Sequence, residues 1–150
     1  MIYISHRGNI DGPNPGLENS IPYIEKALML GYEVEIDVWL IEEKYYLGHD
    51  NPQYEIEKSF LKNRRLWCHA KNLEALEGMR LSKNIRFFWH QEDDATLTSD
   101  NFIWTFPGKK LVKNSICVMP ERSNIKPSDP VLRNCAGVCS DFVKDYRELM

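Results

Sequence analysis

Every histidine in this chain stands at the end of a short apolar run, where a buried strand would deliver it to an open edge. The four are His6, His49, His69 and His90, and three of the four runs also carry acidic or basic partners. In parallel α/β sheets and barrels, ligands bind at the C-terminal ends of the strands. We therefore expect the histidines to contribute to one site, against the alternative that each only ends its own strand.

Two acidic residues, Glu35 and Asp37, stand two positions apart in the segment 33–41, which alternates acidic with apolar residues. A period of two predicts a strand that carries both carboxylates on one face, with their Cβ atoms about 6–7 Å apart. That separation allows both to bind one divalent cation, and oxygen ligands favour Mg²⁺ or Ca²⁺. The alternative is a solvent-exposed strand face that holds no metal.

The pair His6 and His49 suits phosphodiester chemistry, in which one imidazole takes a proton and another donates one. The usual histidine pKa of about 6.5 allows both roles near neutral pH. Arg7 presents a forked donor to phosphate oxygens, and Lys71 adds a second positive charge at another strand end. Together with a metal, these cations would offset the negative charge of a pentacovalent phosphorus transition state.

The elements that must position these residues alternate between strand and helix along the first half of the chain. Strands are expected over residues 2–6, 33–41, 44–49, 66–70, 85–90, 102–106, 115–119 and 136–139. Helices are expected after Glu18-Asn19-Ser20 up to Gly31, over 72–83 with Asn72 as N-cap, and from Asp141 onward. The alternation indicates a parallel α/β sheet, and residues 1–150 fit one domain.

The N-terminal motifs resemble the glycerophosphodiester phosphodiesterase family, within the wider phospholipase C-like phosphodiesterase superfamily. The family pattern begins with H-R-G, continues with E-N-[ST] and E-x-D-V, and reaches H-D at the end of a hairpin. The chain carries these motifs, in the same order and spacing, as His6-Arg7-Gly8, Glu18-Asn19-Ser20, Glu35-Ile36-Asp37-Val38 and His49-Asp50. Residues 136–141 are similar to the family's last strand, G-[IV]-x-[ST]-D. The match to the family pattern is close over the first 50 residues, and beyond them only isolated residues match it.

The resemblance implies a TIM-like (β/α) barrel with catalysis at its C-terminal rim. It implies that His6 and His49 are the acid–base or nucleophile pair and that Arg7 contacts phosphate. It also implies one divalent metal ion, held by Glu35 and Asp37. The expected function is a metal-dependent phosphodiesterase that cleaves a glycerophosphodiester or a related small phosphodiester.

One departure from the family pattern concerns the third metal ligand. The family usually has an acidic residue two positions before a lysine, whereas this chain reads His69-Ala70-Lys71. A neutral imidazole binds metals and would shift the preference toward Mn²⁺ or Zn²⁺, or it weakens the site enough to abolish activity. His90, on the following strand, is either a further member of this cluster or a structural residue. Glu18 is expected to support the site.

A second departure is length, because a TIM barrel typically needs about 250 residues and rarely fewer than about 200. With 150 residues, several outer helices must be missing or shortened. The sequence does not decide whether the strands close into a full barrel. Apolar flanks left by missing helices would suit a homodimer. These departures also favour an alternative function, a catalytically silent barrel that binds a phosphorylated ligand or a protein partner. The short segment 51–65 leaves room for a third option, a phosphodiester within a polymer or glycan.

Composition excludes some classes of function. The net charge of −3 gives no basic surface for nucleic acid, and no apolar stretch approaches the roughly 18 residues of a membrane span. No signal peptide is expected, so we expect a cytoplasmic protein in which Cys68, Cys117, Cys135 and Cys139 are free thiols. Cys135 and Cys139 are a weaker alternative metal or redox pair. Trp104 nears a strand end and is expected to line the pocket, with core packing as the alternative.

Overall fold

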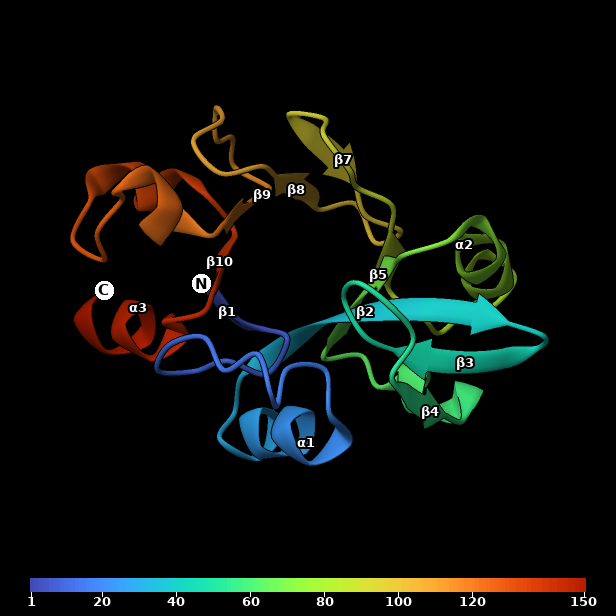
Figure 1. Cartoon of the computed structure of the whole chain (residues 1–150). Helices are drawn as coiled ribbons and strands as arrows, with labels where there is room; N and C mark the ends of the chain where they lie inside the picture. The colour runs from blue at the N-terminus through green and yellow to red at the C-terminus, as the bar shows by residue number, and fades with distance from the viewer.

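Ten strands form one curled sheet, and three α-helices lie on its outside (Figure 1). The computed structural model describes all 150 residues. The strands are β1 (Ile2–His6), β2 (Glu33–Ile41), β3 (Lys44–Leu47), β4 (Tyr54–Ile56), β5 (Leu66–Ala70), β6 (Phe87–Phe88), β7 (Ala95–Leu97), β8 (Ile103–Thr105), β9 (Ser115–Val118) and β10 (Gly137–Ser140). The helices are α1 (Ile21–Met29), α2 (Leu73–Arg80) and α3 (Val143–Leu149). The predicted α/β class is confirmed.

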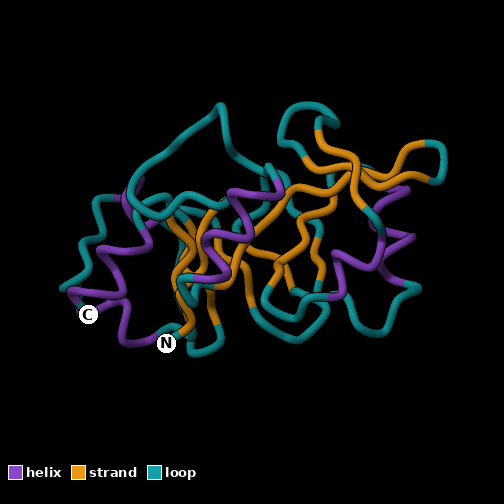
Figure 2. The backbone as a smooth tube through the Cα atoms, turned by 90° about the horizontal axis from the view of Figure 1, so that it is seen from below, coloured by secondary structure: helices purple, strands orange, loops and turns teal.

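The sheet places the first and last strands of the chain side by side. Parallel pairing runs through β6-β5-β2-β1-β10-β9-β8, whereas β3, β4 and β7 pair antiparallel. The end strands β6 and β8 do not pair with each other, so the sheet is a curled half-barrel. The β2–β3 hairpin extends away from the curled part in both views (Figures 1 and 2).

The register of the parallel strands brings most of the predicted site residues to one edge. His6 at the end of β1 is opposite Glu35 of β2, and Asp37 of β2 is opposite His69 of β5. On the other side of β1, Ser5 is opposite Ser140, so the residue after β10, Asp141, also reaches this edge. The C-terminal ends of parallel strands meet where α/β proteins bind ligands.

The two crossover helices begin and end at residues with recognisable capping roles. Pro22 lies in the first turn of α1, and Gly31 follows that helix with a left-handed φ of 87°. Asn72 caps α2 as predicted, because its Oδ1 accepts a hydrogen bond from the Ala75 amide at 3.0 Å. The connections from β6 through β10 carry no α-helix, which agrees with the expected loss of outer helices.

None of the helices combines the length with the apolar composition that crossing a membrane requires. All four cysteines are buried free thiols, as the sequence predicted. The Sγ atom of Cys135 donates to the Leu132 and Gly137 carbonyls, and no cysteine joins a cluster of metal-ligating side chains. The alternative of a Cys135–Cys139 metal site therefore has no support in the structure.

Aromatic side chains fill the inner face of the curled sheet, opposite the helices. Trp104 is only 4% exposed, and its ring centroid lies 4.5 Å from that of Phe88 and 5.8 Å from that of Trp67. These contacts join β8 to β6 and β5 on the side where the backbone does not pair. The structure thus places Trp104 in the core, which corrects the expectation that it lines the pocket.

We expect Trp104→Ala to lower the free energy of unfolding by about 3–5 kcal/mol, because it leaves a cavity between β5, β6 and β8. Urea unfolding measures this change, and Trp104→Phe, which keeps an aromatic ring, should lose less. A loss below about 1 kcal/mol for the alanine variant would contradict the core assignment.

Candidate functional site

A pocket of about 520 Å³ opens at the C-terminal ends of β1 and β10. Only two of its fourteen lining residues are hydrophobic, and the lining includes the predicted residues His6, Arg7, Glu18 and His49. Four other surface hollows, of about 440 to 640 Å³, contain none of the predicted site residues. A hollow of this polarity suits a small, charged ligand better than an apolar one.

Beside this pocket, Glu35, Asp37 and His69 form a cluster whose ligand atoms all lie within 4.8 Å of one another. The Nδ1 atom of His69 is 3.3 Å from Asp37 Oδ1 and 3.7 Å from Glu35 Oε1. Both carboxylates are almost fully buried. The strand alternation predicted the two acids on one face, and the parallel register adds the histidine opposite Asp37.

Asp37 is the centre of charge in this cluster. Arg7 Nε lies 3.0 Å from its Oδ2 and Lys71 Nζ lies 3.5 Å from its Oδ1, while Asn19 Nδ2 donates to Oδ2 at 2.9 Å. Burial alone would raise the pKa of Asp37, but His69, Arg7 and Lys71 together hold that pKa well below its usual value. Asp37 is therefore a carboxylate at every pH at which the protein would work.

The orientation of His69 leaves one nitrogen for the cluster. Its Nε2 donates to the His90 carbonyl at 2.8 Å, so Nδ1 faces the two carboxylates. Burial lowers the pKa of His69, but the carboxylates of Asp37 and Glu35 outweigh burial and raise that pKa to about 9. In the absence of a metal, the imidazolium is the cation between the two acids.

The donor set fits a divalent metal. Glu35 Oε2 and Asp37 Oδ1 are buried and accept no hydrogen bond, although cationic groups lie 3.3 Å or more away from them. Buried carboxylate oxygens that accept no hydrogen bond can take a metal ion as a partner. Deprotonated His69 would add a nitrogen ligand through Nδ1, on the same side as these oxygens. Two carboxylates and one imidazole suit Mn²⁺ or Zn²⁺ at least as well as Mg²⁺.

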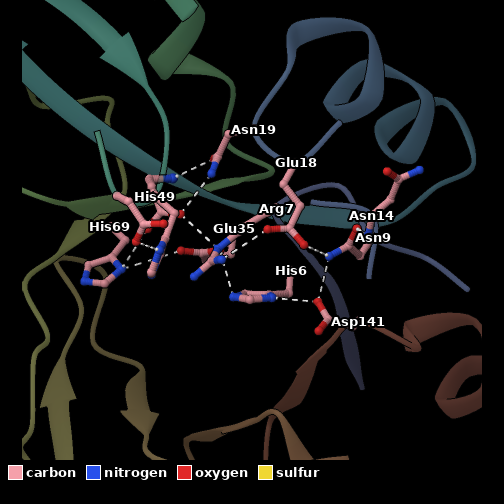
Figure 3. Close-up of polar contacts among 12 residues, drawn as sticks. His6, Arg7, Asn9, Asn14, Glu18, Asn19, Glu35, His49, His69 and Asp141 are labelled. Carbon is pink, nitrogen blue, oxygen red and sulfur yellow. Dashed lines mark hydrogen bonds and ion pairs between the residues drawn. The ribbon is translucent and has the colours of Figure 1, made fainter. Parts of the chain in front are cut away.

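The other half of the site is built on His6. Its Nδ1 lies 2.7 Å from Asp141 Oδ1, and its Nε2 lies 3.9 Å from Glu35 Oε2. Burial lowers the pKa of His6, whereas the hydrogen bond to Asp141 and the charge of Glu35 raise it, and the net shift is upward. Figure 3 shows Arg7 and Glu35 between His6 on one side and His69 on the other. A carboxylate that holds a histidine in this way fixes which nitrogen faces the substrate.

His49 completes the wall of the pocket from the β2–β3 hairpin. The amide of Gly48 donates to the Asp37 carbonyl at 3.1 Å, and Trp39 Nε1 donates to the Gly48 carbonyl at 2.6 Å. These bonds extend the hairpin to the rim, where the His49 side chain is 42% exposed and its Nδ1 contacts Asp50 Oδ1 at 2.6 Å. His6 and His49 therefore differ in burial: one is enclosed, and the other is open to solvent.

The backbone around the motif is held in unusual conformations. Arg7 and Asn19 have left-handed φ angles of 54° and 62°, and both are non-glycine residues. The amide of Asn19 donates to the Arg7 carbonyl at 3.0 Å, and the Arg7 amide donates to the Glu35 carbonyl at 2.9 Å. A Cβ atom on Gly8 would lie 2.5 Å from the Tyr23 ring, which explains the glycine of the H-R-G motif. Strain of this kind is concentrated at functional sites.

The side chain of His90 does not join the cluster. Its Nε2 donates to the Asp93 carbonyl at 2.8 Å, and only its own carbonyl contributes to the site, by accepting from His69. The sequence analysis missed three residues: Asp141, Asn19 and Asn9. The first ends a recognised strand pattern, and the second stands within the E-N-[ST] motif, so both carried a signal that could have identified them.

Comparisons with models of protein families, with curated proteins and with solved structures gave no match for this chain. The interpretation of the site therefore rests on its residues and their geometry.

The raised pKa of His69 predicts how the stability of the metal-free protein depends on pH. Because the pKa is about 6.5 in the unfolded chain and about 9 in the fold, the protonated form stabilises the fold fully below pH 6.5. This contribution, at most about 3 kcal/mol, is lost as the pH rises toward 9. Urea unfolding in EDTA at pH 6.5 and pH 9 measures it. The same pH dependence in His69→Gln would show that another group is responsible.

Proposed function

We propose that this protein is a metal-dependent phosphodiesterase of the glycerophosphodiester phosphodiesterase type. The observation that carries the proposal is that His6 and His49 line one polar pocket beside the Glu35, Asp37 and His69 cluster. We interpret the curled half-barrel as a reduced TIM-like barrel, with this pocket at its C-terminal rim. The predicted substrate is a small phosphodiester with an alcohol head group.

Glu35, Asp37 and His69 are the residues that would hold the metal ion. A bound divalent cation supplies a Lewis acid next to the phosphate oxygens and offsets their negative charge. Glu35 Oε2 and Asp37 Oδ1, which are buried and accept no hydrogen bond, support this role.

The two imidazoles divide the proton transfers between them. One takes a proton from the attacking oxygen while the other donates a proton to the leaving alcohol oxygen as its bond to phosphorus breaks. His6, with Nδ1 occupied by Asp141, uses Nε2 for this step. The attacking oxygen belongs either to water, which gives a linear product, or to a neighbouring substrate hydroxyl, which gives a cyclic phosphate.

Arg7 and Lys71 supply positive charge for the substrate phosphate. Arg7 directs Nε to Asp37 and Nη1 to Glu18 at 3.1 Å, which leaves its Nη2 without a protein partner. Glu18 thus supports the site by orienting the guanidinium. The remaining N–H groups suit the oxygens of a phosphate.

One observation favours the alternative function, a silent module that binds a phosphorylated ligand. His69 replaces an acidic ligand, and its pKa of about 9 makes it an internal cation at the place of the metal. In that case Arg7, which lines the pocket, and Lys71, which contacts Asp37 beside it, bind phosphate without turnover. Affinity for inorganic phosphate in EDTA, with no hydrolysis under any metal condition, would support this alternative.

The test is hydrolysis of bis(p-nitrophenyl) phosphate and of glycerophosphocholine with Mg²⁺, Ca²⁺, Mn²⁺, Zn²⁺ or EDTA. The control is the double variant His6→Ala/His49→Ala. We expect turnover that requires a metal and is lost in the control. Absence of turnover together with absence of metal binding by calorimetry would rule out the catalytic proposal.

Restoring the acidic ligand should change the preferred metal. We expect His69→Glu to favour Mg²⁺ or Ca²⁺, whereas the natural chain favours Mn²⁺ or Zn²⁺, because the variant has only oxygen ligands. The dissociation constant for Mn²⁺ divided by that for Mg²⁺, measured by calorimetry, should rise by roughly tenfold or more in the variant. An unchanged ratio would place His69 outside the metal's ligands.

A further inference from the structure

Asn9 is fully buried and makes four hydrogen bonds through its side-chain amide (Figure 3). Its Nδ2 donates to Glu18 Oε1 at 2.8 Å and to Asp141 Oδ1 at 2.8 Å. Its Oδ1 accepts from the Asn14 amide at 3.0 Å and from the Tyr23 hydroxyl at 3.3 Å. These four bonds use the full capacity of an amide, two donated and two accepted.

The partners of Asn9 determine which side chain suits this position. Two of them are carboxylates, which only accept, and the other two are an amide N–H and a hydroxyl that donate. An aspartate here would set a third carboxylate against Glu18 and Asp141, and an alanine would leave buried polar groups without partners. Only a group with donors on one side and an acceptor on the other satisfies all four.

The two carboxylates held by Asn9 are themselves the partners of the residues that act on the substrate. Asp141 holds Nδ1 of His6 at 2.7 Å, and Glu18 holds Nη1 of Arg7 at 3.1 Å. Asn9 therefore lies between the His6–Asp141 and Arg7–Glu18 pairs and donates one hydrogen bond to each carboxylate. Its backbone is fixed to the same motif, because the Asn9 amide donates to the His6 carbonyl at 2.9 Å.

We infer that Asn9 is a positioning residue that sets the orientation of His6 and of Arg7 together through their two carboxylates. This inference rests on the proposed function, in which His6 transfers a proton and Arg7 contacts phosphate. Loss of the amide frees the Asp141 and Glu18 side chains to rotate. The His6 imidazole and the Arg7 guanidinium are then no longer held in a fixed orientation relative to each other. Small displacements of a reacting group reduce rate by up to about 100-fold.

The experiment compares Asn9→Ala, Asn9→Asp and Tyr23→Phe with the natural chain. Tyr23→Phe removes one bond to Asn9 Oδ1 and keeps the ring, so it tests the inference even if the Asn9 variants do not fold. The matched control is Asn72→Ala, which removes another amide with three hydrogen bonds, two to the backbone of Leu40 in β2 and one to the Ala75 amide at the start of α2. The control reports the loss of stability that any such amide causes.

Two readouts separate positioning from stability. The first is kcat and KM per folded molecule, with about a 10- to 100-fold loss of kcat expected for Asn9→Ala and Asn9→Asp. A smaller loss is expected for Tyr23→Phe. The second is the downfield imidazole N–H proton resonance of His6, identified by its loss in His6→Gln and recorded on the metal-free protein. We expect it to shift or disappear in the Asn9 variants, to shift in Tyr23→Phe, and to persist in Asn72→Ala.

The resonance decides the inference even if no phosphodiester is hydrolysed, because it reports the His6–Asp141 hydrogen bond directly. If the resonance changes in the variants while the natural chain shows neither turnover nor metal binding, the positioning role stands and the phosphodiesterase proposal is rejected. A resonance and kcat that match the Asn72→Ala control in every folded variant, Tyr23→Phe included, would overturn the inference.

Discussion

Replacing His6 with alanine should lower kcat/KM for bis(p-nitrophenyl) phosphate by about 10²- to 10⁴-fold. The imidazole lines the pocket and is held by Asp141 at 2.7 Å through Nδ1, so Nε2, which lies 3.9 Å from Glu35 Oε2, is the nitrogen left for proton transfer. Alanine keeps the backbone of the H-R-G motif and removes the imidazole at the end of β1. Initial rates, corrected for the folded fraction, measure the effect.

His49 provides the internal comparison for this prediction. If the two imidazoles act in one proton-transfer step, His49→Ala alone should lower kcat/KM by a similar factor. The kcat/KM of the double variant should then be little lower than that of either single variant. Losses that multiply instead would assign the histidines to separate steps. A His6→Ala variant that folds, binds metal and keeps kcat/KM within about threefold would contradict an acid–base role for His6.

The parts of the site that could be predicted from sequence are those on regular strands. Alternation over 33–41 placed Glu35 and Asp37 on one face, and a parallel sheet then aligns the end of the strand 66–70 with them. The first step uses periodicity, which is a local property of the sequence. The second uses sheet topology, which follows from the order of strands and helices along the chain. The meeting of His69 with Asp37 is a consequence of that register.

The residues that were missed lie where the chain has no period. Asn9 and Asn19 stand in the irregular segment between β1 and α1, and Asn19 has a left-handed backbone. Asp141 ends a recognised motif, but its contact with His6 spans 135 positions and depends on the pairing of β1 with β10. An apolar pattern indicates which residues are buried, but it does not show which loop side chain turns back into a site.

Trp104 and the short strands β4 and β7 show a second limit of prediction from sequence. A strand end predicts proximity to the rim, yet the direction of the Trp104 side chain depends on the curl of the sheet, which turns it between Phe88 and Trp67. The strands β4 and β7 are three residues each and pair only with neighbouring hairpin strands. Segments this short carry too few residues to show a period.

Replacing Asp37 with asparagine should remove metal binding and destabilise the fold together. Asp37 contacts Arg7, Lys71 and His69, so the variant leaves three cationic groups around a neutral amide. Removing one member of a buried ion cluster costs about 3–5 kcal/mol. It also removes a carboxylate ligand, so the dissociation constant for Mn²⁺ should rise by at least roughly 100-fold, since even outer partners of metal ligands contribute about 10- to 100-fold.

Glu33→Gln is the matched control, because Glu33 lies on the same face of β2 and also belongs to an ion pair. Its Oε2 accepts from Arg86 and from Trp67 Nε1, both at 2.6 Å, at the opposite end of the strand from the pocket. This variant should lose stability and keep the affinity for Mn²⁺. Calorimetric titration together with urea unfolding separates the two effects. Equal loss of metal affinity in Glu33→Gln and Asp37→Asn would show that metal binding follows overall stability, and Asp37 would then not be a ligand.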